Sequence, residues 1–73
     1  MAKMAETFIP ASSTISQATY DRETETLKIT YQDGRAYQYD NVPVTVWQGL
    51  QNAPSAGSYA ARQIRGNYNY MEV

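Results

Sequence analysis

The clearest pattern in the chain is the alternation of apolar and polar residues over 26–31. Leu27, Ile29 and Tyr31 fall on one face of an extended segment, and polar side chains fall on the other. Strict alternation of this kind is typical of a half-buried β-strand. A weaker alternation over residues 15–20 predicts a preceding strand. Two apolar residues there are out of step, which indicates a β-bulge or a position near the sheet edge.

A third strand is predicted at Tyr37 and Tyr39, and the turn that contains Gly34 decides where their rings point. A two-residue loop would direct both rings away from the face of Leu27 and Ile29. A three-residue loop that ends at a left-handed Gly34 would instead pair Ile29 with Tyr37 and Leu27 with Tyr39. Because a domain this small needs its large side chains on one face, we expect the three-residue loop.

The chain changes to a helical pattern after this strand. Pro43 ends the strand and suits the first turn of a helix, since it lacks only an N–H that would be unpaired there. Val46, Leu50 and Ala53 follow at helical spacing, with Trp47 alongside. A first helix is therefore predicted directly after Pro43.

A second helix is predicted from about residue 56 to residue 65. Ser55 is a good N-terminal cap, and Gly66 is suited to close the C-terminal end. Ala60 and Ile64 form its apolar stripe. The remaining residues, 67–73, are expected to form either a short extra strand or an ordered arm.

These elements predict an α+β fold in the order β-β-β-α-α. A small three-stranded antiparallel meander would be covered on one face by a C-terminal helix pair, with the tail as a candidate extension of the sheet. Residues 1–13 have no sustained period and are expected to be a flexible N-terminal lead-in, so that 14–73 form one domain. The predicted core consists of Leu27, Ile29, Tyr37, Tyr39, Trp47, Leu50 and Ile64.

Composition removes several classes of function. The 73 residues include no cysteine and no histidine, which excludes a disulfide and a structural zinc site. No apolar run approaches the roughly 20 residues that cross a bilayer, so a soluble, cytoplasmic protein is expected. The net charge of −1 argues against a strongly electrostatic, non-specific nucleic-acid binder. Residues 41–73 are nevertheless mildly basic, because they carry Arg62 and Arg65 against Glu72 alone.

An ordered set of residues resembles the KTSC domain family, over roughly residues 13–71. The set comprises Tyr20-Asp21, Leu27, Ile29, Gly34, Tyr37, Tyr39, Val42-Pro43, Val46, Leu50, Ser55, Gly57, Tyr59, Ile64 and Tyr68. The family is named for its position at the C-terminus of some lysyl-tRNA synthetases, and it also occurs as stand-alone proteins of bacteria and their phages. The resemblance implies no established activity. RNA binding has been suggested for the family because of the synthetase fusion.

The most suggestive side chains for binding lie late in the chain. Arg62 and Arg65 are predicted near Tyr59 on the second helix, and Tyr68 and Tyr70 follow in the tail. Guanidinium groups beside aromatic rings suit phosphate and base recognition, and equally a protein interface. The alternative is a solvated helix face whose arginine stems cover apolar surface.

Two further groups have a structural and a functional interpretation. Ser55 and Gly57 at a helix start would suit an anion, or they are simply a cap and a site of close packing. Tyr37 and Tyr39 would suit base stacking, but the preferred register places them in the core. On that interpretation Tyr37→Ala would cost about 3 kcal/mol or more.

The sequence therefore predicts a non-enzymatic binding module, with no catalytic residue, metal or cofactor. The leading hypothesis is RNA binding, for instance of tRNA, through Ser55, Gly57, Tyr59, Arg62, Arg65, Tyr68 and Tyr70. The alternative hypothesis is a protein-interaction module, such as a small phage or bacterial adaptor or inhibitor, that uses the same tyrosine-rich surface.

Overall fold

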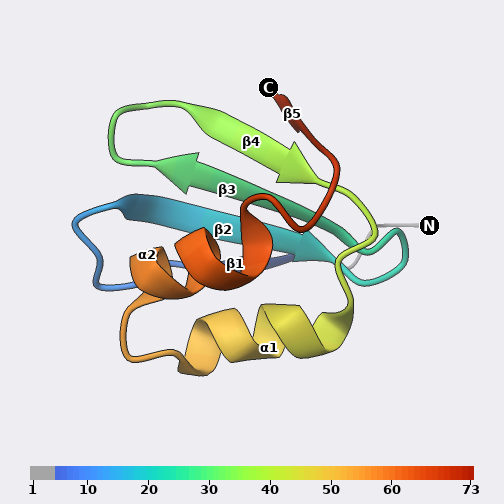
Figure 1. The fold of residues 1–73 in the computed structure, drawn as a ribbon, viewed down its shortest axis with the longest axis horizontal. Coiled ribbons are helices and arrows are strands. Elements are labelled where there is room, and N and C mark those ends of the chain that lie inside the picture. The colour runs from blue at the N-terminus through green and yellow to red at the C-terminus, as the bar shows by residue number, and fades with distance from the viewer. Residues whose placement is uncertain (1–4) are drawn as a thin grey trace.

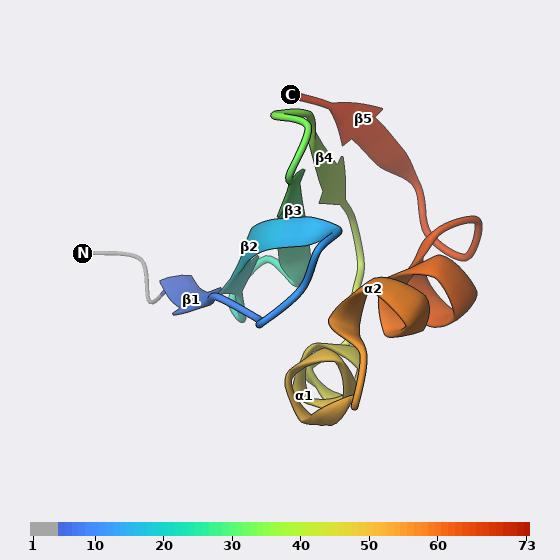
Figure 2. The ribbon, with the colours of Figure 1, turned by 90° about the vertical axis from the view of Figure 1, so that its left-hand side faces the viewer.

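A computed structural model describes residues 5–73 and contains an antiparallel sheet with the strand order β1-β2-β3-β4-β5. Helices lie on one face of this sheet, and no helix of residues 5–73 lies on the other, which we call the uncovered face (Figures 1 and 2). The strands are β1 (Ala5–Phe8), β2 (Ile15–Asp21), β3 (Thr26–Tyr31), β4 (Ala36–Tyr39) and β5 (Tyr70–Glu72). The helices are α1 (Val44–Asn52), α2 (Ala56–Tyr59) and the π-helical turn η1 (Ala60–Ile64).

The sheet has five strands, so the prediction of three was wrong in number. Residues 5–8, inside the predicted lead-in, form β1, which pairs with β2 so that Phe8 lies opposite Ala18. Residues 1–4 lie outside the described residues. The tail forms β5 and pairs with β4. Both added strands are short, and neither shows the long alternation that makes a strand recognisable in a sequence.

The hairpin of β3 and β4 has the register of a three-residue loop, as predicted. Leu27 lies opposite Tyr39 and Ile29 lies opposite Tyr37. Gly34 has φ +92°, a left-handed conformation that costs glycine little. The Gly34 N–H donates to the Tyr31 carbonyl at 3.0 Å. The turn therefore places Tyr37 and Tyr39 on the helix-covered face of the sheet. In β2 the register shifts between Ile15 and Gln17, which agrees with the first of the two predicted alternatives, a bulge, and not with the second, a position near the sheet edge.

The helix boundaries follow the predicted caps closely. The Pro43 carbonyl accepts the N–H of Val46 at 3.0 Å, and α1 begins directly after it. Ser55 caps α2 through its side-chain oxygen, which accepts the N–H of Ser58 at 3.3 Å. Beyond α2 the chain widens into η1, which ends at Ile64 with Arg65 as its C-terminal cap. Gly66, which was predicted to close the helix, has φ +83° and lies in the turn that follows, where the Asn67 N–H donates to the Ile64 carbonyl at 3.1 Å. No helix among residues 5–73 combines the length and apolar character needed to cross a membrane.

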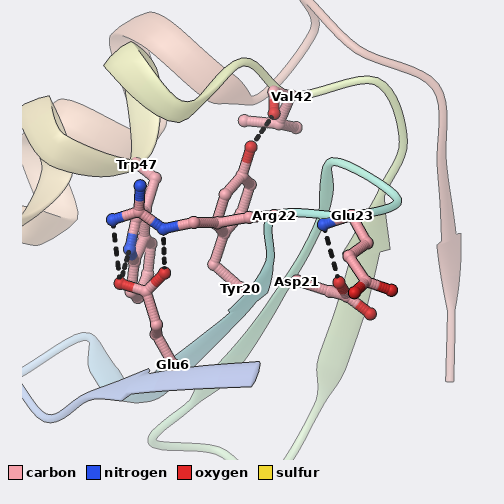
Figure 3. A network of polar contacts seen from close by, with 7 residues as sticks. All are labelled: Glu6, Tyr20, Asp21, Arg22, Glu23, Val42 and Trp47. Carbon is pink, nitrogen blue, oxygen red and sulfur yellow. Dashed lines mark hydrogen bonds and ion pairs between the residues drawn. The ribbon is translucent and has the colours of Figure 1, made fainter. Parts of the chain in front are cut away.

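The core lies between the sheet and the helices and is centred on Trp47. Trp47, Leu50 and Ile64 are fully buried beneath β2 and β3. The Tyr20 ring stacks on the Trp47 ring with centroids 5.4 Å apart, and its hydroxyl donates to the Val42 carbonyl (Figure 3). The predicted core omitted several residues that are fully buried, namely Ile15, Ala18, Tyr20 and Val42.

Polar contacts of Glu6 hold β1 against this core. The Glu6 carboxylate accepts the indole N–H of Trp47 at 3.1 Å and forms an ion pair with Arg22 (Figure 3). The hydrogen bonds from Arg22 and Trp47 lower the pKa of Glu6 below its ordinary value. Glu6 thereby links the first strand to a helix residue far along the chain, and satisfies the polar end of a buried indole.

The two hallmark tyrosines differ in burial. Tyr39 is only 3% exposed and belongs to the core, as predicted. Tyr37 is half-buried and packs against the edge of the core instead of within it. The assignment of Tyr37 to the core was therefore only partly correct.

Candidate functional site

A hollow of about 740 Å³ opens beside the uncovered end of β3, β4 and β5. Its walls come from these strands, from the β1–β2 loop, from the β3–β4 turn and from the chain just after η1. We call it the tyrosine hollow and define it by Tyr31, Tyr37, Tyr39, Tyr70, Arg35 and Arg65, all of which line it. Among the described residues, the lining includes no aliphatic side chain, and its apolar surface comes mainly from tyrosine rings.

Strand register brings the rings together. The β3–β4 pairing sets Tyr37 beside Tyr31, and the β4–β5 pairing sets Tyr70 opposite Tyr39. Tyr37 meets Tyr31 edge-on at 5.8 Å and 71°, and meets Tyr70 edge-on at 5.9 Å and 69°. Tyr70 also lies 5.9 Å from Tyr39 with the planes tilted by 38°. Edge-to-face contacts of this kind hold aromatic rings in defined orientations.

Two arginines supply the positive charge of the tyrosine hollow. Arg35 directly follows the Gly34 turn, and a hydrogen bond with the Tyr37 hydroxyl raises the pKa of its guanidinium. Arg65 directly follows η1. Burial, assisted by the Tyr31 hydroxyl, raises the pKa of Tyr39, and the charge of Arg65 offsets only part of that rise. Tyr39 is therefore a neutral hydrogen-bonding group near neutral pH.

A second hollow of about 560 Å³ adjoins the first and shares Ser13, Thr14, Tyr31 and Arg65 with it. Its other walls include Ser12, Ser55 and Ser58, so hydroxyl groups dominate its polar surface. We call it the hydroxyl hollow.

Gly57 allows the close approach of α2 to the loop that forms this second hollow. A Cβ atom at Gly57 would lie 3.1 Å from Thr14 Cβ and 3.2 Å from Thr14 Oγ1. The neighbouring helix therefore packs directly on residues 12–14. Arg65 stands between the two hollows and can reach a ligand in either.

The family model of the KTSC domain matches residues 11–68, which is most of the chain. The chain belongs to the KTSC domain family. The match begins after β1 and ends before β5, so it covers the sheet strands β2 to β4 and both helices. The expected resemblance is thus confirmed.

The similar proteins contain domains of this kind in two contexts, as part of a longer ligase and as nearly the whole of a shorter chain. A lysine–tRNA ligase of Trichormus variabilis is 38% identical over 64 residues, and one of Nostoc punctiforme is 36% identical over 64 residues. Each match covers 88% of this chain but spans only 11% of the ligase. A crystal structure of a KTSC domain protein from Yersinia pestis is 27% identical, with a TM-score of 0.87, and covers 94% of this chain and 97% of that one.

The predicted binding residues are divided among several places in this KTSC domain. Arg65 and Tyr70 line the tyrosine hollow, and Ser55 and Gly57 line the hydroxyl hollow. Tyr68 is half-buried and packs against the core.

The other two predicted residues face elsewhere. Tyr59 lies against α1, where a Cβ atom on Gly49 would come within 2.2 Å of the Tyr59 hydroxyl. Arg62 is exposed, and its Nε donates to the Ser58 carbonyl of its own helix at 3.4 Å. Tyr59 and Arg62 are therefore not among the residues that line the tyrosine hollow.

Sequence reasoning missed Tyr31 and Arg35 as members of the site. The signal for Tyr31 was present, since it occupies the same strand face as Leu27 and Ile29 and so must lie near Tyr37 in the preferred register. Arg35 follows the turn and has no periodic signal of its own. Among residues 5–73, no group of three or more potential metal ligands is positioned to hold a metal ion.

Proposed function

We propose that this KTSC domain is a non-enzymatic module that binds unpaired nucleotides of RNA in the tyrosine hollow. The observation behind the proposal is the half-exposed Tyr37 ring, which is held edge-on between Tyr31 and Tyr70 with Arg35 and Arg65 on the same walls. RNA-binding proteins bind unpaired bases by stacking them on the faces of aromatic side chains, and each stacked base contributes about 1–3 kcal/mol.

The chemistry of the lining favours a nucleotide over an apolar peptide. An aliphatic peptide anchor would be expected to meet aliphatic walls, whereas this hollow is lined by tyrosines, two arginines, hydroxyl-bearing residues, Gln32 and one acid, Asp33. Tyrosine and arginine side chains also suit a protein interface, so the lining argues only against an aliphatic anchor. Arginine forks match phosphate oxygens, and the hydroxyls of Ser13 and Thr14 offer further hydrogen bonds. The lysine–tRNA ligases that match this chain are named for a tRNA substrate, which is consistent with an RNA ligand here.

The proposal predicts a modest dependence of affinity on salt. Two phosphate contacts, at Arg35 and Arg65, give a slope of about −1.4 in a plot of log affinity against log salt for a single strand. Affinity for a short single-stranded RNA should therefore fall about seven-fold between 50 mM and 200 mM salt. Arg65→Ala should reduce the slope to about −0.7. Lys28→Ala is the matched control, because Lys28 is an exposed cation on the uncovered face.

A second pair of variants tests stacking separately from charge. Tyr70→Ala removes a ring that is 62% exposed, and should weaken RNA binding at least five-fold at an unchanged salt slope. Met71→Ala is its control in the same strand, since Met71 faces the opposite side of the sheet and is 57% exposed. Fluorescence anisotropy with a labelled single strand, the matching duplex and unfractionated tRNA provides the measurement.

The outcomes separate the two classes of ligand. Binding of single strands and tRNA but not of the duplex supports the proposal, provided that Tyr70→Ala and Arg65→Ala both weaken it. No binding at millimolar RNA, or binding that ignores both variants, refutes it. If a protein ligand instead binds with an affinity that does not change with salt and that is lost in Tyr70→Ala, that result would refute RNA binding and support the protein-interaction alternative.

A further inference from the structure

The last strand of the sheet has an open edge with apolar side chains. β5 pairs with β4 on one side, and no described strand pairs with its other side. Tyr70, Met71 and Val73 are 62%, 57% and 57% exposed, and Ile9 is the other large apolar residue of 5–73 that is so exposed. Edge strands are normally protected by charged side chains, above all lysine, by proline, by a bulge or by being short. Residues 70–73 contain no lysine, proline or bulge, so the protection of this edge comes from Glu72 and from the three-residue length of β5.

The hydrogen-bond pattern determines which backbone groups face the open edge. The Val73 N–H donates to the Ala36 carbonyl, and the Asp40 N–H donates to the Asn69 carbonyl. Successive residues of an antiparallel strand direct their N–H and C=O groups to opposite sides. Residues 69, 71 and 73 therefore face β4, and Tyr70 and Glu72 direct their backbone groups outward. An added strand would have to bind at Tyr70 and Glu72.

We propose that β5 pairs with β5 of a second copy of this chain, antiparallel and centred on Met71. In this register Tyr70 of each copy lies opposite Glu72 of the other, so the outward backbone groups of these residues satisfy one another. The Tyr70 hydroxyl is a donor and the Glu72 carboxylate is an acceptor, and both lie on the helix-covered face. Met71 meets Met71 of the second copy on the uncovered face.

The sequence of β5 selects this register over its neighbours. A shift that keeps the outward groups aligned would place Glu72 opposite Glu72 of the second copy, and like charges directly opposite one another are destabilising. A shift the other way would set Tyr70 against Tyr70 and place Glu72 opposite Tyr68 of the second copy. Tyr68 lies outside β5, and its ring packs against the core of its own chain instead of pairing across the edge. Self-complementarity of this kind is the property of an isologous interface between identical chains. It identifies a second copy, and not an unrelated strand, as the occupant.

Such a dimer would be weak, since a few paired residues bury less than the roughly 1,200 Å² typical of stable complexes. Sedimentation equilibrium at concentrations from about 10 µM to about 1 mM is the appropriate measurement for an interface of that size. Met71→Lys places two positive charges at the symmetry axis and should weaken dimerisation at least ten-fold. Thr7→Lys adds the same charge to the same face at the opposite edge of the sheet and should leave dimerisation unchanged.

A cysteine pair tests the register itself. The chain has no cysteine of its own, so a single introduced thiol can be followed without interference. Met71→Cys brings two Cα atoms to about 4.5 Å across the axis, which allows a disulfide. Val73→Cys is equally exposed and on the same face, but its two copies would be about 14 Å apart along the strands, too far for a disulfide.

Under mild oxidation, Met71→Cys should form a disulfide-linked dimer at least ten-fold faster than Val73→Cys. A chain that stays monomeric throughout the concentration range overturns the proposal. So does crosslinking of Val73→Cys at the rate of Met71→Cys, because that result would indicate random collision. Dimerisation that survives Met71→Lys but is lost in Thr7→Lys would assign the contact to β1 and also overturn it.

Discussion

The Tyr20 hydroxyl offers a sharp test of how this core is held together. Tyr20 and Val42 are both fully buried, and the hydroxyl donates to the Val42 carbonyl. Tyr20→Phe keeps the ring and its stacking contact with Trp47 but removes the donor. The Val42 carbonyl would then be left without this partner in a site that is closed to solvent.

Leaving a buried hydrogen-bonding group without a partner lowers the free energy of unfolding by about 1–3 kcal/mol, and this is the expected effect of Tyr20→Phe. A domain of this size has a free energy of unfolding on the order of 5 kcal/mol, so the loss is a large fraction of the total. At about 2 kcal/mol, the melting temperature should fall by about 8–16 °C. Urea denaturation followed by tryptophan fluorescence should report a lower midpoint with an unchanged slope, since the folded core is otherwise retained.

Tyr70→Phe serves as the matched control for this measurement. Its ring is 62% exposed, so loss of its hydroxyl should change the free energy of unfolding by less than about 0.5 kcal/mol. A Tyr20→Phe variant that matches wild type within that margin would refute the assignment of a stabilising buried hydrogen bond. A changed slope would instead indicate a rearranged native or denatured state.

Two further predictions concern Glu6 and Tyr37. The pKa of Glu6 is depressed in the folded state, so its stabilising effect is present above the ordinary value of 4.5 and is lost as the pH falls through the folded-state pKa. Glu6→Gln should therefore have a lower urea midpoint than wild type at pH 7, and the difference should shrink below pH 4.5; a difference that is constant with pH would contradict the contact. Tyr37→Ala should cost about 2 kcal/mol, because the ring is half-buried, and should stay folded by far-UV circular dichroism while losing RNA affinity. Complete unfolding of Tyr37→Ala would contradict this expectation and would show that Tyr37 is a core residue, as the sequence alone suggested.

Local rules in the sequence were sufficient for the central hairpin and for the helix caps. Gly34 determines the turn, the turn determines the register, and the register places Tyr37 opposite Ile29. Ser55 marks the start of the second helical segment for an equally local reason, and Gly66 marks the turn that follows its end at Ile64. The same rules could not reveal β1, since its anchor is the contact of Glu6 with Trp47 from a distant part of the chain.

Tyr59 and Arg62 of the predicted arginine and tyrosine stripe do not line the tyrosine hollow with Arg65, for a different physical reason. The predicted stripe assumed the regular spacing of an α-helix from Tyr59 to Arg65. The segment Ala60–Ile64 is instead π-helical, and the Arg65 N–H donates to the Ala60 carbonyl five residues earlier. The wider turn changes the angular positions of the residues that follow it. Tyr59 packs against Gly49 of α1, where the absence of a side chain leaves room for its hydroxyl. The helical periodicity of the sequence could not predict this contact, because it joins two different helices.

The order of the strands also has a consequence for folding kinetics. β1 to β4 are joined in sequence by short connections, so their pairing requires only small loop closures. β5 is separated from β4 by both helical segments, and its pairing has the larger entropic cost of closing that loop. Tyr70 should therefore reach Tyr37 and Tyr39 late in folding. A slow step that is lost when β5 is deleted would mark the moment at which the tyrosine hollow is completed.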